Sequence, residues 1–163
     1  MAKRPRQVFD DLARLGTLLS SSIDARLRRE CGLPLSSLRV LLAAADHTPA
    51  CRVQDIADAL VITVGGASQA VDRLEQRGLC VRRCNPADRR SSLVDLTPAG
   101  RNLLDEAAPV YDQELDTLLS VSLPEASFTE LAHALAALRG AVAVGVPSKG
   151  GSPDRVGLGS AAG

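Results

Sequence analysis

Aromatic side chains are nearly absent from the chain, which has no tryptophan, one tyrosine and two phenylalanines among 163 residues. Aromatic stacking partners for a bound ligand are therefore scarce. The sequence also lacks any run of 18 or more apolar residues, which argues against a membrane-spanning helix. The basic start Met-Ala-Lys-Arg-Pro-Arg is not followed by an apolar segment, as it would be in a signal peptide. We therefore expect a cytoplasmic protein with no membrane partner.

The residues that catalysis requires are also missing as a set. The two histidines, His47 and His133, belong to no metal-spaced pair and no nucleophile motif, and we expect both to be exposed. The pair Gly65-Gly66 lacks the Lys-Ser/Thr that completes a phosphate-binding loop. The sequence thus predicts that the protein is not an enzyme, and it predicts no cofactor and no metal site.

The four cysteines are the basis for an alternative function, in which the protein responds to a thiol oxidant or a metal. Cytosolic cysteines are usually reduced. Cys80 and Cys84 lie four residues apart on one expected strand, on the same face but about 13 Å from each other, which is too far for a disulfide. A zinc site built from Cys31, Cys51 or His47 requires the fold to bring them together. We expect ordinary thiols and keep a thiol- or metal-responsive function as an alternative.

The formal net charge is zero, but the two signs are distributed unevenly. Residues 1–101 hold 16 of the 19 Lys and Arg and 11 of the 19 Asp and Glu, a net charge of +5, and the remainder gives residues 102–163 a net charge of −5. Attraction to phosphate is local and decays within about 10 Å at moderate salt. The basic part can therefore bind a polyanion while the acidic part orients the molecule.

The basic part contains a pattern typical of two short helices joined by a tight turn. Apolar residues recur at helical spacing over residues 54–60 and again over residues 64–77, where the expected buried stripe is Ala67, Ala70, Val71 and Leu74. The three residues between them are enough only for a turn. Thr63 suits the N-cap of the second helix, and Gly78 suits its left-handed end.

The second helix has the features of a DNA-reading helix. Gly65 and Gly66 in its first turn each cost roughly 1 kcal/mol relative to alanine. Either the helix start is loose, or the small residues let it approach a DNA backbone closely. Helix-turn-helix proteins place the N-terminal half of this helix in the major groove. Ser68 and Gln69 would then reach base edges or phosphates, and Arg73 would reach phosphate.

A two-stranded hairpin is expected directly after this helix. Residues 79–84 and 92–96 have strand character, and three residues are expected to point inward: Val81, Val94 and Leu96. Residues 50–53 are expected to form a third short strand that pairs with the hairpin. A helix over residues 34–45 precedes them.

Arginines are concentrated on this hairpin and on its loop. They are Arg82, Arg83, Arg89 and Arg90. Arginine is attracted to a narrow minor groove by its enhanced negative potential. Asp88 in the loop cannot meet phosphate, so we expect it to pair with a nearby arginine and to set the shape of the loop.

Several motifs at this spacing resemble the multiple-antibiotic-resistance regulator (MarR) family of winged-helix transcription factors. They are Val71-Asp72-Arg73-Leu74-Glu75, Gly78-Leu79, Asp88-Arg89-Arg90 and Leu96-Thr97-Pro98-Ala99-Gly100. With the flanking helices, the resemblance covers about residues 8–139. It implies a homodimer that binds a palindromic operator in double-stranded DNA, usually as a repressor, and that a small-molecule effector often releases. It also implies that Asp88 and Arg90 shape the wing and that Arg89 or Arg90 enters the minor groove.

Long apolar stripes on both sides of this unit predict a dimerisation bundle. One long helix is expected over residues 8–30, and two more over residues 98–119 and 125–139, the first of them capped by Thr97. These stripes are longer than a small winged-helix unit can cover. A symmetric dimer supplies the missing partner and presents two reading helices about 34 Å apart. A simple helical packing unit is the alternative.

The expected fold is mainly α (α+β), a winged helix-turn-helix unit with N- and C-terminal helices that form a dimerisation bundle. Its parts are a flexible N-terminus (1–7), an N-terminal dimerisation helix (8–33), the winged helix-turn-helix DNA-binding unit (34–97), C-terminal dimerisation helices (98–143) and a disordered tail (144–163).

The sequence thus predicts a DNA-binding transcriptional regulator, with a protein-interaction module on the same scaffold as the alternative from another class. A DNA reader should lose affinity steeply as salt rises. Replacing Arg89 and Arg90 together by alanine should weaken binding to all duplexes. The predicted DNA-binding residues are Thr63, Gly65, Gly66, Ser68, Gln69, Arg73, Arg83, Asp88, Arg89 and Arg90.

Overall fold

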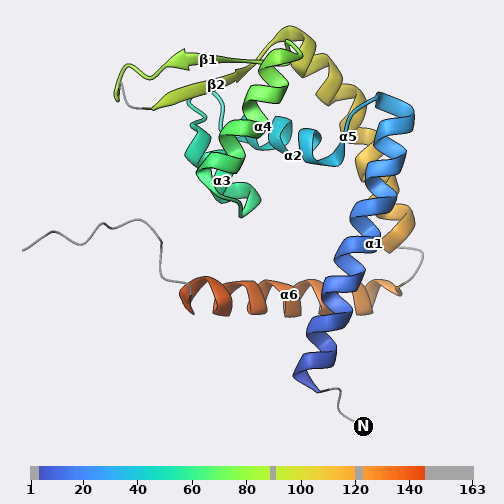
Figure 1. The fold of residues 1–163 in the computed structure, drawn as a ribbon. Helices are drawn as coiled ribbons and strands as arrows, with labels where there is room; N and C mark the ends of the chain where they lie inside the picture. The colour runs from blue at the N-terminus through green and yellow to red at the C-terminus, as the bar shows by residue number, and fades with distance from the viewer. Residues whose placement is uncertain (1–3, 89–90, 120–122, 146–163) are drawn as a thin grey trace, which may run out of the picture. The chain divides into compact units, whose positions relative to one another are not determined.

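Six helices and one antiparallel hairpin make up the described part of the chain, as the fold class predicted (Figure 1). The computed structural model describes residues 4–88, 91–119 and 123–145. The elements are α1 (Pro5–Cys31), α2 (Leu35–Asp46), α3 (Val53–Leu60), α4 (Val64–Gln76), β1 (Cys80–Cys84), β2 (Ser92–Leu96), α5 (Pro98–Leu119) and α6 (Glu125–Gly145). The chain divides into two units, residues 1–122 and 123–163. Of the helices described, none is both long and apolar enough to cross a membrane.

The core of the first unit lies where α2, α3, α4 and the root of the hairpin pack together. Its most buried large side chains are at most 1% exposed and come from all four elements: Leu38, Leu41, Ile56, Val71, Leu74 and Val94. Burial of each such side chain is worth about 1.5–3 kcal/mol. Because both α3 and α4 bury apolar faces here, the core fixes the direction in which the exposed face of α4 points.

Local signals set both ends of α4. The hydroxyl of Thr63 accepts a hydrogen bond from the Gly66 N–H at 3.1 Å, so Thr63 is the N-cap that the sequence predicted. Gly78 has a φ of +68°, the left-handed conformation expected at the end of this helix. The helix ends at Gln76, one residue earlier than predicted.

A cluster of backbone contacts joins the end of α4 to the start of α5. The hydroxyl of Thr97 donates to the Gly78 carbonyl at 2.7 Å and accepts from the Gly100 N–H at 3.0 Å, so Thr97 caps α5 as predicted. The Thr97 N–H also donates to the Leu79 carbonyl at 3.1 Å. A Cβ on Gly100 would lie 1.9 Å from that same Leu79 oxygen, so only glycine fits here.

The prediction that Val81 points inward is wrong. The register pairs Cys80 with Leu96 and Arg82 with Val94, and Cys80, Val94 and Leu96 are buried whereas Val81 is 42% exposed. Side chains alternate along a strand. The inward face is the one on which Arg82 reaches acidic partners on α4 (below), and this phase places Val81 outside.

Cys80 is buried and Cys84 is exposed, because the outer end of the hairpin extends beyond the helices (Figure 1). One further expectation about the hairpin needs correction. The third strand expected at residues 50–53 is reduced to a single bridge between Arg52 and Leu93, with a 2.7 Å hydrogen bond from the Val94 N–H to the Cys51 carbonyl.

Helix α1 is longer than predicted and buries only part of its apolar stripe. It begins at Pro5, within the segment expected to be flexible, and ends at Cys31. Ile23 and Leu27 are buried against the core. The apolar residues nearer its N-terminus are 37–70% exposed: Val8, Phe9, Leu12, Leu15 and Leu18.

Helix α6 also extends further than predicted, to Gly145 rather than residue 139. Its large apolar side chains include four that are 41–64% exposed: Phe128, Leu135, Leu138 and Val142. The predicted disordered tail lies, from residue 146 onward, outside the described residues.

Candidate nucleic-acid interface

The first turn of α4 presents bare backbone to solvent. Gly65 is exposed, and a Cβ added there would meet no atom within 4 Å. A Cβ on Gly66 would lie 3.2 Å from the Thr63 hydroxyl oxygen that caps the helix. Gly66 therefore has a reason within the fold to be small, whereas for Gly65 the fold provides none.

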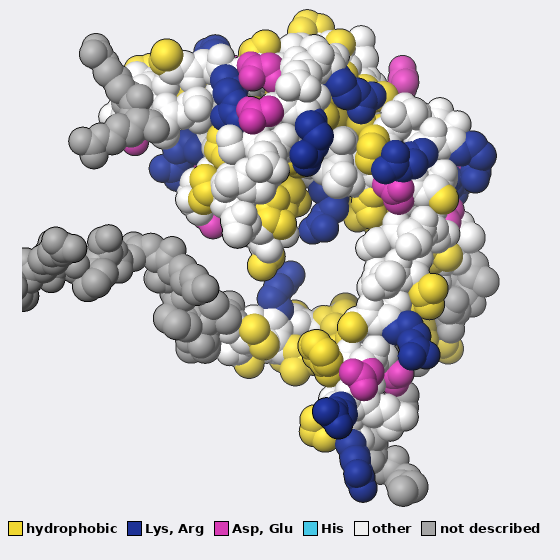
Figure 2. Space-filling model, viewed as in Figure 1, with side chains coloured by type: hydrophobic (Ala, Val, Ile, Leu, Met, Phe, Trp, Pro, Cys, Tyr) yellow, Lys and Arg dark blue, Asp and Glu magenta, His cyan; other side chains and the backbone are white. Residues whose placement is uncertain are grey.

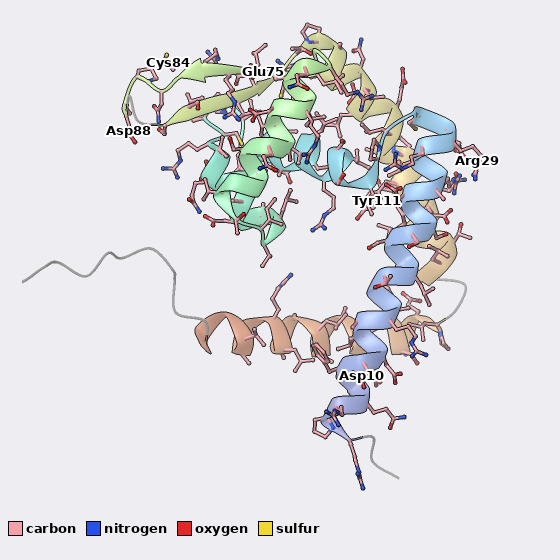
Figure 3. The ribbon with its side chains drawn as sticks, viewed as in Figure 1. Asp10, Arg29, Glu75, Cys84, Asp88 and Tyr111 are labelled. Atoms are coloured by element: carbon pink, nitrogen blue, oxygen red, sulfur yellow. The ribbon has the colours of Figure 1, made fainter. Side chains whose placement is uncertain are left out.

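Arg82 of β1 joins the hairpin to α4, a role that the sequence did not reveal. Its Nη2 atom donates to the Asp72 carboxylate at 2.6 Å and to both the carbonyl and the hydroxyl oxygen of Ser68, each at 3.1 Å. Its backbone N–H donates to the Glu75 carboxylate at 2.9 Å. Figure 3 shows Glu75 on α4 beside the hairpin. The side chain of Arg82 is only 22% exposed, so this guanidinium is largely committed to the fold.

This joint changes the chemistry expected of Ser68 and of the acids on α4. Because the Ser68 oxygen accepts from Arg82, its hydroxyl proton remains able to donate to another acceptor. Asp72 and Glu75 form ion pairs with Arg82, so part of their repulsion toward a polyanion is offset. Two acids on the exposed side of a helix expected to meet DNA were the sequence signal for an internal arginine partner.

The other predicted residues of α4 are placed on its surface. Gln69 and Arg73 are exposed and lie four residues apart, so they share one face of the helix. Ser68 is half-buried, as its contacts with the hairpin require.

Arg83 lies on the opposite side of β1 from Arg82 and remains 58% exposed. It donates a hydrogen bond to the Asp95 carboxylate on β2, and this bond raises the pKa of the Arg83 guanidinium. An exposed pair of this kind is worth little in water. Arg83 can therefore exchange Asp95 for another anion, which Arg82 cannot do at comparable cost.

The loop of the hairpin is shaped mainly by Asn85, which the sequence did not single out. Its side-chain carbonyl accepts from the Ala87 N–H at 3.0 Å, and its amide donates to the Ser91 hydroxyl at 2.9 Å. The Asp88 carbonyl accepts from both the N–H and the hydroxyl of Ser91. Asp88 is exposed near the outer end of the hairpin, close to Cys84 (Figure 3). Arg89 and Arg90 lie outside the described residues.

A hollow of about 420 Å³ separates the hairpin from the starts of α3 and α4. It brings together residues that are far apart in the sequence: Arg52, Val53, Gln54, Val64, Ser68, Arg82, Asp88, Ser91 and Ser92. Arg52, like Arg82, lies at this surface but was not among the DNA-binding residues predicted from the sequence. It pairs with Asp55 at 2.9 Å, which raises the pKa of Arg52, and its side chain is 54% exposed. Figure 2 shows Lys and Arg side chains spread over this part of the molecule, with acidic groups among them.

The thiols and histidines do not assemble into a second site. Among residues 4–88, 91–119 and 123–145, no three or more His, Cys, Asp or Glu side chains are grouped so that they could hold a metal ion. Burial raises the pKa of the Cys51 and Cys80 thiols to about 11. Both histidines are exposed, as predicted.

Known proteins resemble this chain in sequence and in fold. A model of the MarR family matches residues 32–91, from the end of α1 to the residue before β2. The solved structure of Sco3205, a MarR family transcriptional regulator from Streptomyces coelicolor in complex with DNA, superposes with a TM-score of 0.76 at 27% identity, covering 93% of this chain and 96% of that one. The chain thus resembles the MarR family in sequence over residues 32–91 and in fold over most of its length.

Two other proteins are similar to this chain over different lengths. MhqR, an HTH-type transcriptional regulator of Bacillus subtilis (strain 168), is 35% identical over 69 residues, or 42% of this chain. The chain spans about half of that relative, 48% of its length. The structure of BpsR from Bordetella bronchiseptica, whose DNA binding is regulated by 6-hydroxynicotinic acid, has a TM-score of 0.75 at 27% identity and covers 85% of this chain and 97% of that one.

Proposed function

We propose that the protein is a sequence-specific transcriptional regulator, acting as a repressor, that binds a palindromic DNA operator as a homodimer. The observation that carries the proposal is the joint made by Arg82, because it holds an exposed helix start and an arginine-bearing hairpin as one rigid surface. Helix-turn-helix proteins insert such a helix into the major groove. The similarity to Sco3205, which was solved in complex with DNA, supports the same conclusion.

Within this proposal the predicted residues have separate roles. Ser68, Gln69 and Arg73 meet base edges or phosphates from α4, while Thr63 caps the helix and the two glycines let it approach. Arg83 meets phosphate from the hairpin, where Asp88 contributes to the loop that carries Arg89 and Arg90 into the minor groove. Ser68 donates through the proton that Arg82 leaves available.

The homodimer is supported by the unburied half of α1. Five apolar side chains there are 37–70% exposed: Val8, Phe9, Leu12, Leu15 and Leu18. A second copy would remove this surface from water, with about 25 cal/mol gained for each Å² of apolar area buried. Exposed apolar residues on α6 offer more such surface on the second unit.

We further propose that a small-molecule effector releases the protein from DNA. An open hollow of about 710 Å³ is lined by α1 and α2, with Asp24 and Arg39 as its charged groups. Asp24 also accepts from the Leu35 N–H at 2.8 Å and so ties the start of α2 to α1. A ligand that contacts these groups would act on the helix pair that supports the DNA-binding unit. BpsR supports such regulation by analogy.

The decisive experiment is selection of retained duplexes from a random pool by the purified protein, followed by sequencing. We expect an enriched palindrome with half-sites about one helical turn apart. Weak, salt-sensitive binding to all duplexes with no enrichment would contradict a sequence-specific regulator and favour a basic interaction module.

A matched pair of variants then tests the surface itself. Arg83→Met should lower the salt dependence of binding by about one phosphate contact, because this exposed side chain can exchange Asp95 for phosphate. Arg82→Met should weaken binding while leaving the salt slope almost unchanged, because it acts by holding α4 and the hairpin together. Equal changes in slope for both variants would contradict the division of roles.

A further inference from the structure

Three apolar side chains are exposed at the turn between α3 and α4. Val61 is 89% exposed, Ile62 44% and Val64 46%. We call these three residues the turn patch. Ile56 in α3 and Ala67 in α4 are fully buried, whereas Ala59 is exposed and Leu60, directly before the turn patch, is half-buried.

The backbone of the turn patch also departs from what its residues prefer. Val61 has a φ of +56° and a ψ of +46°, the left-handed conformation that β-branched residues rarely adopt. Among the described residues, Val61 is the one non-glycine with a positive φ. Neither burial nor backbone preference explains these residue types. Such local violations concentrate at functional sites.

The turn patch is continuous with the proposed DNA-binding surface, and the neighbouring hollow is lined by two arginines and one aspartate. Val64 is the first residue of α4, directly before the bare Gly65. It also lines the hollow beside the hairpin together with Arg52, Ser68 and Arg82. A surface of mixed arginine and small apolar groups suits DNA better than an apolar protein face. In the major groove, the apolar group that a base edge offers is the C5-methyl of thymine.

We propose that Val64, with Ile62 beside it, selects thymine in each operator half-site by packing against the C5-methyl group. This inference rests on the proposed function, because it assigns a specificity role on the same surface. Val64 is the principal reader because it belongs to the helix that enters the groove, and Ile62 extends the apolar contact from the turn.

The test removes the methyl group without changing any hydrogen bond of the base. In the duplex selected from the random pool, each half-site thymine is replaced by deoxyuridine, symmetrically in both half-sites. At one thymine position or more, the wild-type Kd should rise about tenfold. This factor corresponds to the loss of two buried methyl groups, one from each half-site. Val64→Ala should weaken binding to the thymine duplex by a similar factor and should then distinguish thymine from uracil by less than about twofold.

Val81→Ala is the matched control, since it makes the same chemical change at a valine of similar exposure, 42%, on the outer face of β1. It should retain the full preference for thymine. A wild-type protein indifferent to uracil at every position, or a Val64→Ala protein with undiminished preference, overturns the inference while leaving DNA binding intact. Loss of self-association in Val64→Ala with unchanged DNA affinity also overturns it, and would assign the turn patch to contact between copies. A pool with no enriched duplex overturns the proposed function itself.

Discussion

Replacing Gly65 by alanine separates two explanations of the glycine-rich start of α4. Nothing lies within 4 Å of the position that the new Cβ would occupy, so the substitution meets no clash. Alanine is favoured over glycine within a helix by up to about 1 kcal/mol. We therefore expect Gly65→Ala to raise the free energy of unfolding by that amount and the Tm by about 2–4 °C. If DNA approaches this backbone closely, the same methyl group should raise the Kd for the selected duplex by about tenfold or more.

The two quantities are measured separately, by thermal denaturation and by fluorescence anisotropy with the labelled duplex. Gly140→Ala is the control, because this glycine also has open space at its Cβ position and, by helical spacing, lies away from the exposed apolar residues of α6. It should stabilise the protein without altering its affinity for DNA. A Gly65→Ala protein that is more stable and binds with unchanged affinity would refute close approach and leave a loose helix start as the better explanation.

Three further outcomes test packing, burial and charge. Gly100→Ala should lower the free energy of unfolding by about 3 kcal/mol or more in chemical denaturation, because its Cβ would lie 1.9 Å from a backbone carbonyl oxygen. Iodoacetamide at pH 8 should modify exposed Cys84 well before buried Cys51, whose pKa burial raises to about 11, and peptide mass spectrometry that finds equal rates would contradict this burial. A hydrogen bond from Ser22 is the first cause that lowers the pKa of Glu114 below 4.5, so the folded state binds fewer protons than the unfolded state. The stability that Glu114 contributes should be present above about pH 4.5 and decline as the pH falls through the folded pKa, and Glu114→Gln should remove this decline.

The helices were predictable from the sequence because their signals are local. Apolar spacing located every helix end to within three residues except the end of α6, which lies six residues further on. Single side chains marked the helix ends that matter for the site. Thr63 and Thr97 cap α4 and α5 through hydroxyl contacts within three residues, and Gly78 supplies the left-handed turn. Such contacts depend on neighbours in the chain and need no knowledge of the tertiary fold.

The sequence did not reveal which side chains of β1 point toward the core, because two rules give opposite answers there. An apolar residue is expected inside and a charged one outside, which favoured Val81. The structure buries most of Arg82 instead, since α4 offers it two carboxylates and a hydroxyl that no local pattern connects with β1. A strand only five residues long gives too few alternations to reveal the phase. The contact spans 10 to 14 residues of sequence, and only the packed fold brings its members together.

This pairing also limits what net charge can say about the site. Six arginines and two aspartates within residues 77–101 suggested a strongly basic hairpin. Arg82 is mostly buried against Asp72 and Glu75, which belong to α4 and were outside that count. Arg83 shares Asp95 but stays more than half exposed, and an exposed ion pair is easily exchanged for phosphate. The same residue type at adjacent positions therefore serves two purposes, one that holds the surface together and one that can contact a ligand. The charge available to DNA is consequently smaller than the composition indicates, so specificity should depend more on the shape and the apolar groups of the α4 start.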